Sequence, residues 1–163
     1  EIYNSTDSTL NLAGYYITDD INELTKWQIP YGYPDSTTID SCGYKILWAD
    51  DEPWDGLLHL GFKLSKEGEQ IILVDPDSFT IIDSVTYEPQ TTNISMGRYP
   101  DGDDSWFFFE KPTPGYKNMP GLLGVADSVT FSNPAGLYSS SFSLNISDDD
   151  PLSEIVYLSL IHI

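Results

Sequence analysis

The 163-residue sequence is poor in cysteine, histidine and positive charge. Cys42 is its single cysteine, so no disulfide can form within the chain, and the paired-cysteine patterns of zinc and redox sites are absent. We interpret Cys42, next to Gly43, as a small packing residue rather than a nucleophile. Seven lysine and arginine residues stand against 26 aspartate and glutamate residues, which gives a formal net charge of −19. This charge repels phosphate backbones and argues against nucleic acid as a partner.

Long apolar runs and helical periodicity are also missing. No apolar run approaches the length that spans a membrane. Short segments rich in β-branched and aromatic residues alternate with turn residues instead, which predicts an all-β fold, an antiparallel β-sandwich. The first residue is Glu1 rather than methionine and no signal peptide follows, so we expect the chain to begin inside a longer protein.

Residues that could carry catalysis are scarce. The two histidines, His59 and His162, lie far apart, and His59 stands between two leucines as a residue on a strand face would. The sequence has no Gly-x-Ser-x-Gly, no phosphate-binding loop and no His-Glu-x-x-His. We therefore predict that the protein is not an enzyme and that it has no catalytic residues and no cofactor.

The most informative stretch is residues 97–115, GRYPDGDDSWFFFEKPTPG. It predicts a short strand at 96–99, a tight turn at 100–105 built on Asp-Gly, and an aromatic strand at 106–109 that the following prolines end. Four consecutive aromatic side chains need burial, so we expect the strand at 106–109 to be central to the core.

Other segments predict further strands. They are residues 10–18 with Gly14 as a bulge, 26–29, 43–49, 70–75 and 79–87, with a loop at 31–35 and an apolar segment at 57–62. The side chains expected to be mostly buried are Trp48, Ile71, Leu73, Val85, Trp106 and Phe108.

Several motifs occur together in an order that resembles a known module. The chain opens with EIYN, continues with KWQIP at 26–30 and FKLSKEGE at 62–69, and closes with the Gly-Arg, Pro-Asp-Gly and Pro-Thr-Pro-Gly of residues 97–115. Over residues 1–118 this order resembles the lamin tail domain of the bacterial secreted type, an immunoglobulin-like module. The resemblance implies an immunoglobulin-like β-sandwich without catalytic activity and an extracellular or cell-surface location.

A second module is expected after a linker at residues 119–126. Residues 127–163 contain Asn133-Pro134 and the alternating Phe142-Ser-Leu144-Asn-Ile146, with a further strand at 155–157. They resemble the start of the C-terminal β module of chitobiase and β-hexosaminidase-like proteins. The last residues, 158–163, depart from that pattern, so we expect this module to be incomplete.

Acidic clusters make calcium the most plausible ion, because calcium binds several converging oxygen ligands. The cluster at 50–55 has partial EF-hand spacing, but Pro53 occupies a ligand position. We interpret these aspartates as turn residues and predict no metal site. The weak calcium candidates are Asp50, Asp51, Asp55, Asp101, Asp103 and Asp104.

Arg98 is the only arginine in the chain. Its planar guanidinium suits a two-pronged ion pair or a stack on a ring, so we predict a structural role for Arg98. We expect it to be at least half buried and bonded to a carboxylate, with Asp83 as the first candidate, or to backbone carbonyls at the sheet end. We also expect Trp106 to be a structural residue of the core. Trp54, in an acidic loop, is the surface residue best placed to stack on a sugar. Asn-x-Ser/Thr sequons at Asn4, Asn93 and Asn145 are interpreted as chance matches.

Two functions remain open. The first is a non-catalytic structural or protein-interaction module of a larger secreted bacterial multidomain protein, whose partners are other domains of the parent chain, or protein or glycan at the cell surface. The alternative is a carbohydrate-binding accessory domain of an extracellular glycan-acting enzyme, which the chitobiase-like segment suggests.

Overall fold

The computed structural model describes residues 1–125, 129–149 and 154–155. Its regular structure is almost entirely antiparallel strands, which confirms the predicted all-β class and is consistent with an immunoglobulin-like β-sandwich. Contacts divide the chain into a first unit, residues 1–123, and a second unit, residues 124–163. No helix in the described residues is long and apolar enough to cross a membrane.

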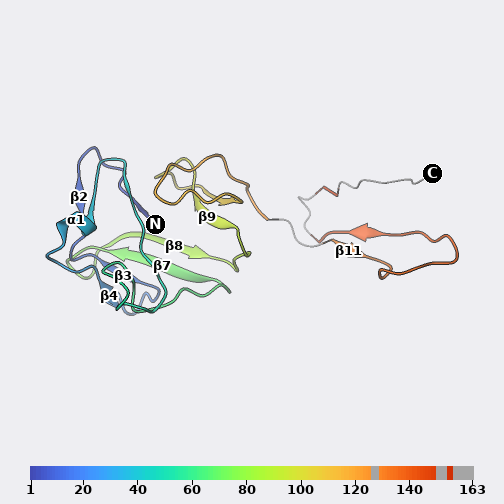
Figure 1. The fold of residues 1–163 in the computed structure, drawn as a ribbon, viewed down its shortest axis with the longest axis horizontal. Coiled ribbons are helices and arrows are strands. Elements are labelled where there is room, and N and C mark those ends of the chain that lie inside the picture. The colour runs from blue at the N-terminus through green and yellow to red at the C-terminus, as the bar shows by residue number, and fades with distance from the viewer. Residues whose placement is uncertain (126–128, 150–153, 156–163) are drawn as a thin grey trace. The chain divides into compact units, whose positions relative to one another are not determined.

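A four-stranded antiparallel sheet forms the largest layer of the first unit (Figure 1). Its strands, in spatial order, are β4 (Trp27–Gln28), β3 (Tyr16–Thr18), β7 (Glu69–Val74) and β8 (Ile81–Tyr87). β3 and β8 pair with the two edges of β7, and its Ile-Ile-Leu-Val run suits a strand with apolar contacts on both faces. Ile72 and Val74 are fully buried on one face, whereas Ile71 and Leu73 are partly buried on the other.

Short strand pairs and one helical turn complete the first unit. They are β1 (Ile2–Tyr3) with β6 (Tyr44–Lys45), β2 (Leu10–Asn11) with β5 (Thr38–Ile39), β9 (Ser95–Arg98) with β10 (Trp106–Phe109), and α1 (Pro34–Thr37). The helical turn overlaps the loop expected at 31–35. Pro34 begins it, because the fixed φ of proline fits the first turn of a helix and its missing N–H costs nothing there.

Gly14 is a corner of the sandwich rather than a bulge. The single strand expected at 10–18 is divided into β2 and β3, which belong to different sheets. Between them Gly14 has a φ of +90°, and a Cβ at this position would lie 2.0 Å from the hydroxyl oxygen of Tyr31. Glycine tolerates the positive φ and leaves room for the Tyr31 hydroxyl, which allows the chain to turn from one sheet to the other at this position.

The core lies against the inner face of the four-stranded sheet. Its fully buried members are Leu12, Ile17, Ile29, Ile39, Leu60 and Phe62. Burying an aliphatic or aromatic side chain of this size contributes about 2 kcal/mol. These residues come from strands and loops on both sides of the Gly14 corner, so this cluster holds the short pairs to the large sheet.

Three expectations about burial are wrong. The strand at 106–109 is not central: among the residues that the structure describes, β10 pairs with β9 and forms one further bridge, between Phe108 and Leu122. Phe109 is its one buried side chain. Trp48 is 56% exposed, because residues 46–49 leave the strand and form only a bridge to His59. Cys42 is exposed in a turn with a φ of +56° rather than packed. Partial burial is found at Ile71, Leu73, Val85, Trp106 and Phe108.

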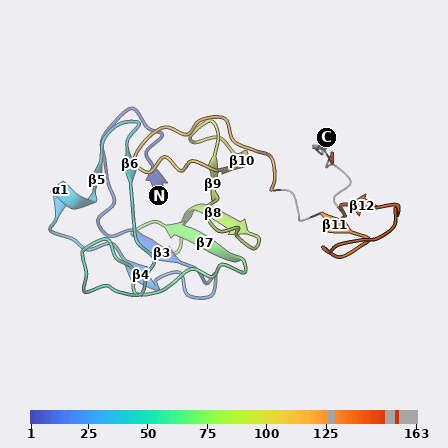
Figure 2. The same ribbon diagram turned by 45° about the vertical axis from the view of Figure 1, so that its right-hand side comes forward.

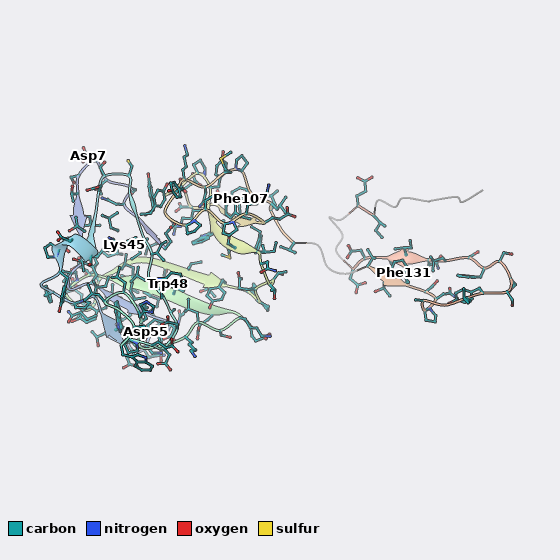
Figure 3. The ribbon with its side chains drawn as sticks, viewed as in Figure 1. Asp7, Lys45, Trp48, Asp55, Phe107 and Phe131 are labelled. Carbon is teal, nitrogen blue, oxygen red and sulfur yellow. The ribbon has the colours of Figure 1, made fainter. Side chains whose placement is uncertain are left out.

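In the described residues of the second unit, β11 (Thr130–Phe131) forms a short antiparallel pair with β12 (Ile146–Ser147). Phe131, labelled in Figure 3, pairs with Ile146 across this ladder and is 54% exposed. The rings of Tyr138 and Phe142 lie 4.3 Å apart between the two strands in sequence. The strand expected at 155–157 and the departure expected at 158–163 lie mostly outside the described residues.

Candidate functional site

Arg98 lies at the centre of a cluster formed by three elements of the first unit. It stands directly opposite Trp106 across the β9–β10 ladder, and its guanidinium carbon lies 5.0 Å from the centroid of the indole ring. Its Nη2 donates to Asp83 Oδ1 at 2.6 Å, and its Nη1 donates to the Asp103 carbonyl at 3.2 Å. The Arg98 side chain is 21% exposed. The structure thus brings together Arg98, Asp83 and Trp106, which the sequence analysis had singled out.

Asp83 is the more exposed partner of this ion pair. It lies on β8 with 53% of its side chain accessible, and its Oδ1 also accepts a hydrogen bond from the Ser84 N–H at 2.8 Å. A second carboxylate, Asp104, lies 3.7 Å from Arg98 Nη1 and is fully exposed. Because solvent screens both carboxylates, the interaction is weaker than that of a fully buried pair.

The turn after β9 is held by Asp101 and Asn118. Asp101 accepts a hydrogen bond from the Tyr44 hydroxyl at 2.9 Å and from the Asn118 N–H at 3.2 Å. The Asn118 side chain in turn donates to the Arg98 carbonyl at 2.9 Å. Burial, together with the neighbouring Asp101 carboxylate, raises the pKa of Tyr44 above its ordinary value. Asp101 therefore fastens the turn to β6 and to the segment that follows β10.

The acidic loop at 50–55 is organised by a histidine. Asp50 Oδ2 lies 2.6 Å from His59 Nδ1, and Asp50 Oδ1 accepts from the Glu52 N–H at 3.2 Å. Burial acts to raise the pKa of Asp50, but the hydrogen bonds from His59 and Glu52 outweigh it and lower that pKa. Asp51 adopts a φ of +58°, as aspartate does in tight turns.

The calcium candidates lie in two separate loops of the first unit. Within residues 1–125, 129–149 and 154–155, no group of three or more histidine, cysteine, aspartate or glutamate side chains is placed to hold a metal ion. Several candidate oxygens bind protein donors instead. Asp103, for example, accepts from the Ser105 N–H at 2.9 Å, and this bond lowers its pKa.

Two tryptophans are exposed at the acidic loop: Trp48 precedes it and Trp54 lies within it. Trp48 stacks on His59 with ring centroids 6.1 Å apart and planes 18° apart. Trp48 is 56% exposed and Trp54 is 76% exposed; Figure 3 labels Trp48 and the nearby loop residue Asp55. The sequence analysis selected Trp54 for the surface but placed Trp48 in the core. The apolar alternation of residues 44–48 gave no sign that the strand ends at Lys45.

Asn4 is a structural residue that the sequence analysis missed. It is 1% exposed, and its side-chain amide donates to the carbonyls of Ser8, Ile39 and Asp40 at 2.8, 3.2 and 3.0 Å. Its Oδ1 accepts from the Thr6 N–H and from the Thr6 hydroxyl. All polar atoms of the Asn4 side chain are therefore used in hydrogen bonds, so the sequon presents no free amide. The position of Asn4 in a polar turn directly after a strand was the sequence signal for this structural role.

A cleft of about 950 Å³ opens beside the inner face of the four-stranded sheet. Its apolar lining includes Ile17, Ile71, Leu73 and Val85 from the sheet, and Met96 and Trp106 from the β9–β10 pair. The partial exposure of Ile71, Leu73 and Val85 results from this opening, because the short pairs do not cover the whole sheet.

The fold and these contacts define the class of protein. The molecule is an immunoglobulin-like β module in which charged side chains fasten turns and strand ends. The family model of the Lamin Tail Domain matches residues 1–89, more than half of the chain. The protein therefore belongs to the lamin tail domain family, whose immunoglobulin-like domain is non-catalytic. The match ends before residues 97–115, so the resemblance of that stretch to the family stays a prediction. No curated protein and no solved structure matches the chain.

Proposed function

We propose that the chain is a structural or protein-interaction module of a larger secreted bacterial multidomain protein. The observation that carries this proposal is the lamin tail domain match over residues 1–89, because that family is a non-enzymatic immunoglobulin-like module. The uses of the charged residues support it: Arg98, Asp101 and Asp50 each hold a neighbouring segment in place. Its partners are other domains of the parent chain or molecules at a cell surface.

The test is selection of binders by the full chain from a displayed library of random polypeptides. We expect the immobilised chain to enrich specific sequences, which then bind the soluble chain saturably. The same chain, irreversibly denatured and immobilised at the same density, serves as the control, since it lacks the folded surface. Enrichment no greater than on this control would contradict an interaction role.

A second candidate function is carbohydrate binding as an accessory domain of an extracellular glycan-acting enzyme. The observation in its favour is the exposure of two tryptophans of one loop region: Trp48, which stacks on the hydrogen-bonded His59, and Trp54, which is 76% exposed. An exposed aromatic face with adjacent polar groups suits a sugar ring, which has apolar faces and hydroxyl edges. The resemblance of residues 127–163 to a chitobiase-like module also suggests a glycan.

This candidate is tested by titrating the full chain with chitin oligosaccharides and following tryptophan fluorescence. Binding should disappear in Trp48→Ala and in Trp54→Ala. Tyr116→Ala is the matched control, because Tyr116 is an aromatic residue of the first unit that is 75% exposed, against 76% for Trp54. Absence of binding, or equal loss in all three variants, would dismiss a sugar platform at Trp48 and Trp54.

A further inference from the structure

The outer side of β8 has no strand partner in the described part of the chain. β7 is the one strand that pairs with β8 there, and β9 pairs with β10 instead. Figures 1 and 2 both show β8 between β7 and β9. The unpaired N–H and C=O groups of an edge strand are a template for another strand.

Part of this edge is accessible. Lysine, proline, other charged residues and bulges protect edge strands; β8, IIDSVTY, contains no lysine or proline, but Asp83 is held by Arg98 of β9 and accepts from the Ser84 N–H. Ile81, Ile82, Ser84 and Thr86 are exposed. The register of the β7–β8 ladder shifts between Leu73 and Val74 of β7, so Ile82 of β8 has no partner there. Regular pairing of β8 runs from Asp83 to Tyr87. Ile81 and Ile82 are 42% and 50% exposed. Apolar residues exposed together at an edge mark a contact surface.

The cleft adjoins this edge. Ile82 to Val85 of β8 form part of its lining, and Met96 of β9 and Trp106 of β10 also line it. The side chains of an extended segment alternate between two sides. A segment that paired with β8 would therefore place every second side chain in the apolar cleft.

The charge around the cleft favours a basic partner. Its lining includes four carboxylates, from Glu1, Asp83, Asp101 and Asp104, and two cations, from Lys66 and Arg98. Both cations lie close to carboxylates: Arg98 bonds Asp83, and Lys66 lies 3.5 Å from Glu67. With a net charge of −19 on the chain, a basic ligand is attracted and an acidic one is repelled.

We propose that the edge of β8 and the adjoining cleft bind an extended polypeptide segment in which apolar and basic residues alternate. The segment adds to the sheet as a further strand along Asp83 to Tyr87, with apolar side chains in the cleft and basic side chains at its acidic rim. A small apolar molecule would fill the cleft but leave the strand edge and the carboxylates unused. The proposal rests on the protein-interaction function proposed above and names its surface.

Two variants separate strand addition from general attraction. The Ser84 N–H donates to Asp83, which indicates that this amide points away from β7, and the Thr86 amide points the same way because strand amides alternate. Thr86→Pro removes that outer donor, and Thr86→Val is its control. Ile82→Lys adds a charge to the apolar edge. Ile21→Lys, at a residue that is 48% exposed in a turn, is the control for the added charge.

The probe is a capped nine-residue peptide of alternating valine and lysine, titrated into the full chain and followed by calorimetry and amide NMR shifts. We expect saturable binding with shifts along β8. Thr86→Pro and Ile82→Lys should each weaken binding by roughly tenfold or more, and the two controls by no more than about twofold. A valine–glutamate peptide should bind at least about tenfold more weakly. Thermal melts of each variant confirm that it is folded.

Three results would overturn the proposal: no binding of the valine–lysine peptide, equal weakening by Ile82→Lys and Ile21→Lys, or binding that Thr86→Pro leaves unchanged. Polypeptides selected from the displayed library are then tested on the same variants. If they bind Thr86→Pro and Ile82→Lys as well as the parent, the interaction function stands and its surface lies elsewhere. If the library yields no binder, the interaction function fails as well.

Discussion

The guanidinium of Arg98 lies over the indole ring of Trp106, the residue directly opposite it on the neighbouring strand, at 5.0 Å from the ring centroid. The same guanidinium reaches the Asp83 carboxylate on β8 at 2.6 Å. One side chain therefore links the β9–β10 pair to the edge of the four-stranded sheet.

Removing this side chain should destabilise the first unit. Arg98→Ala loses the contact with the ring and two hydrogen bonds, so we expect the free energy of unfolding to fall by about 2 kcal/mol. Arg98→Lys should recover only part, because lysine lacks the planar two-pronged donor. Because Asp83 is 53% exposed, a double-mutant cycle with Asp83→Asn should give a coupling energy of only about 1 kcal/mol. Denaturant melts measure all three, and a coupling near zero would leave Asp83 without a part in the stability.

Asn4 should tolerate neither a smaller nor an isosteric replacement. Asn4→Ala leaves three carbonyls without their donor in a buried place, which should cost about 3 kcal/mol. Asn4→Asp should cost at least as much, since it turns a carboxylate oxygen toward those carbonyls. An Asn4→Asp protein that melts with the parent in denaturant would refute this role.

Gly102 has both a positive φ and a close contact at its missing Cβ, whereas Gly115 has the positive φ alone. The φ of Gly102 is +78°, and a Cβ would lie 3.2 Å from the ring of Tyr3; Gly115 has a φ of +77° but nothing near its missing Cβ. Gly115→Ala should therefore cost about 1 kcal/mol for backbone strain alone. Gly102→Ala should cost more because the Tyr3 ring must also move. Equal unfolding free energies for the two variants would show that the turn does not press on Tyr3.

Alkaline pH should destabilise the protein through Tyr44. Because its pKa in the folded state lies above the ordinary 10.0, the folded state holds this proton more tightly than the unfolded state. The resulting stability is complete below pH 10.0 and is lost as the pH rises through the folded-state pKa. Tyr44→Phe should flatten this decline, and part of it should persist because burial also raises the pKa of Tyr87. Tyr116→Phe, at a 75% exposed residue, is the control, and urea melts from pH 8 to about 11 follow the effect.

Calcium should have little effect on stability. An ion at a concentration equal to its dissociation constant stabilises by about 0.4 kcal/mol, which corresponds to roughly 2 °C in melting temperature for a domain of this size. We expect a shift no larger than this in millimolar calcium, reversed by a chelator. A much larger shift that Asp51→Asn or Asp103→Asn abolishes would establish a site in the corresponding loop.

The sequence predicted most strands of the first unit because their apolar residues lie between turn residues. It placed β10 at its observed bounds, 106–109, and β7 and β8 within two residues. It could not show that the segment at 10–18 divides at Gly14, since the division depends on Tyr31 packing against that glycine. Nor could it show that Trp48 lies outside the strand pairing, because burial depends on which segments cover a strand and not on its alternation.

For the candidate site, too, the sequence predicted some features and not others. Asp83 was predicted as the first candidate partner of Arg98 because it interrupts the apolar row of a neighbouring strand, which is a signal that the sequence itself carries. The cleft and the free edge of β8 arise from strand order, which local pattern does not determine. Asn4 was overlooked because its three acceptors include Ile39 and Asp40, more than thirty residues away.

Asn4 and the turn at 100–102 also determine when the first unit can be completed during synthesis. The hydrogen bonds of Asn4 cannot form until Ile39 and Asp40 have been synthesised, and the bond of Tyr44 cannot form before Asp101. Asp101 in turn accepts from the amide of Asn118, which is synthesised later still. Such long sequence separations slow folding, because each loop must close before its contact can form. A nascent chain that has emerged only as far as residue 90 holds the β7–β8 hairpin without the β9–β10 pair that lines the cleft. Until residue 118 leaves the ribosome, the apolar face of the β7–β8 hairpin is open to other nascent chains and to the chaperones that shield such surfaces.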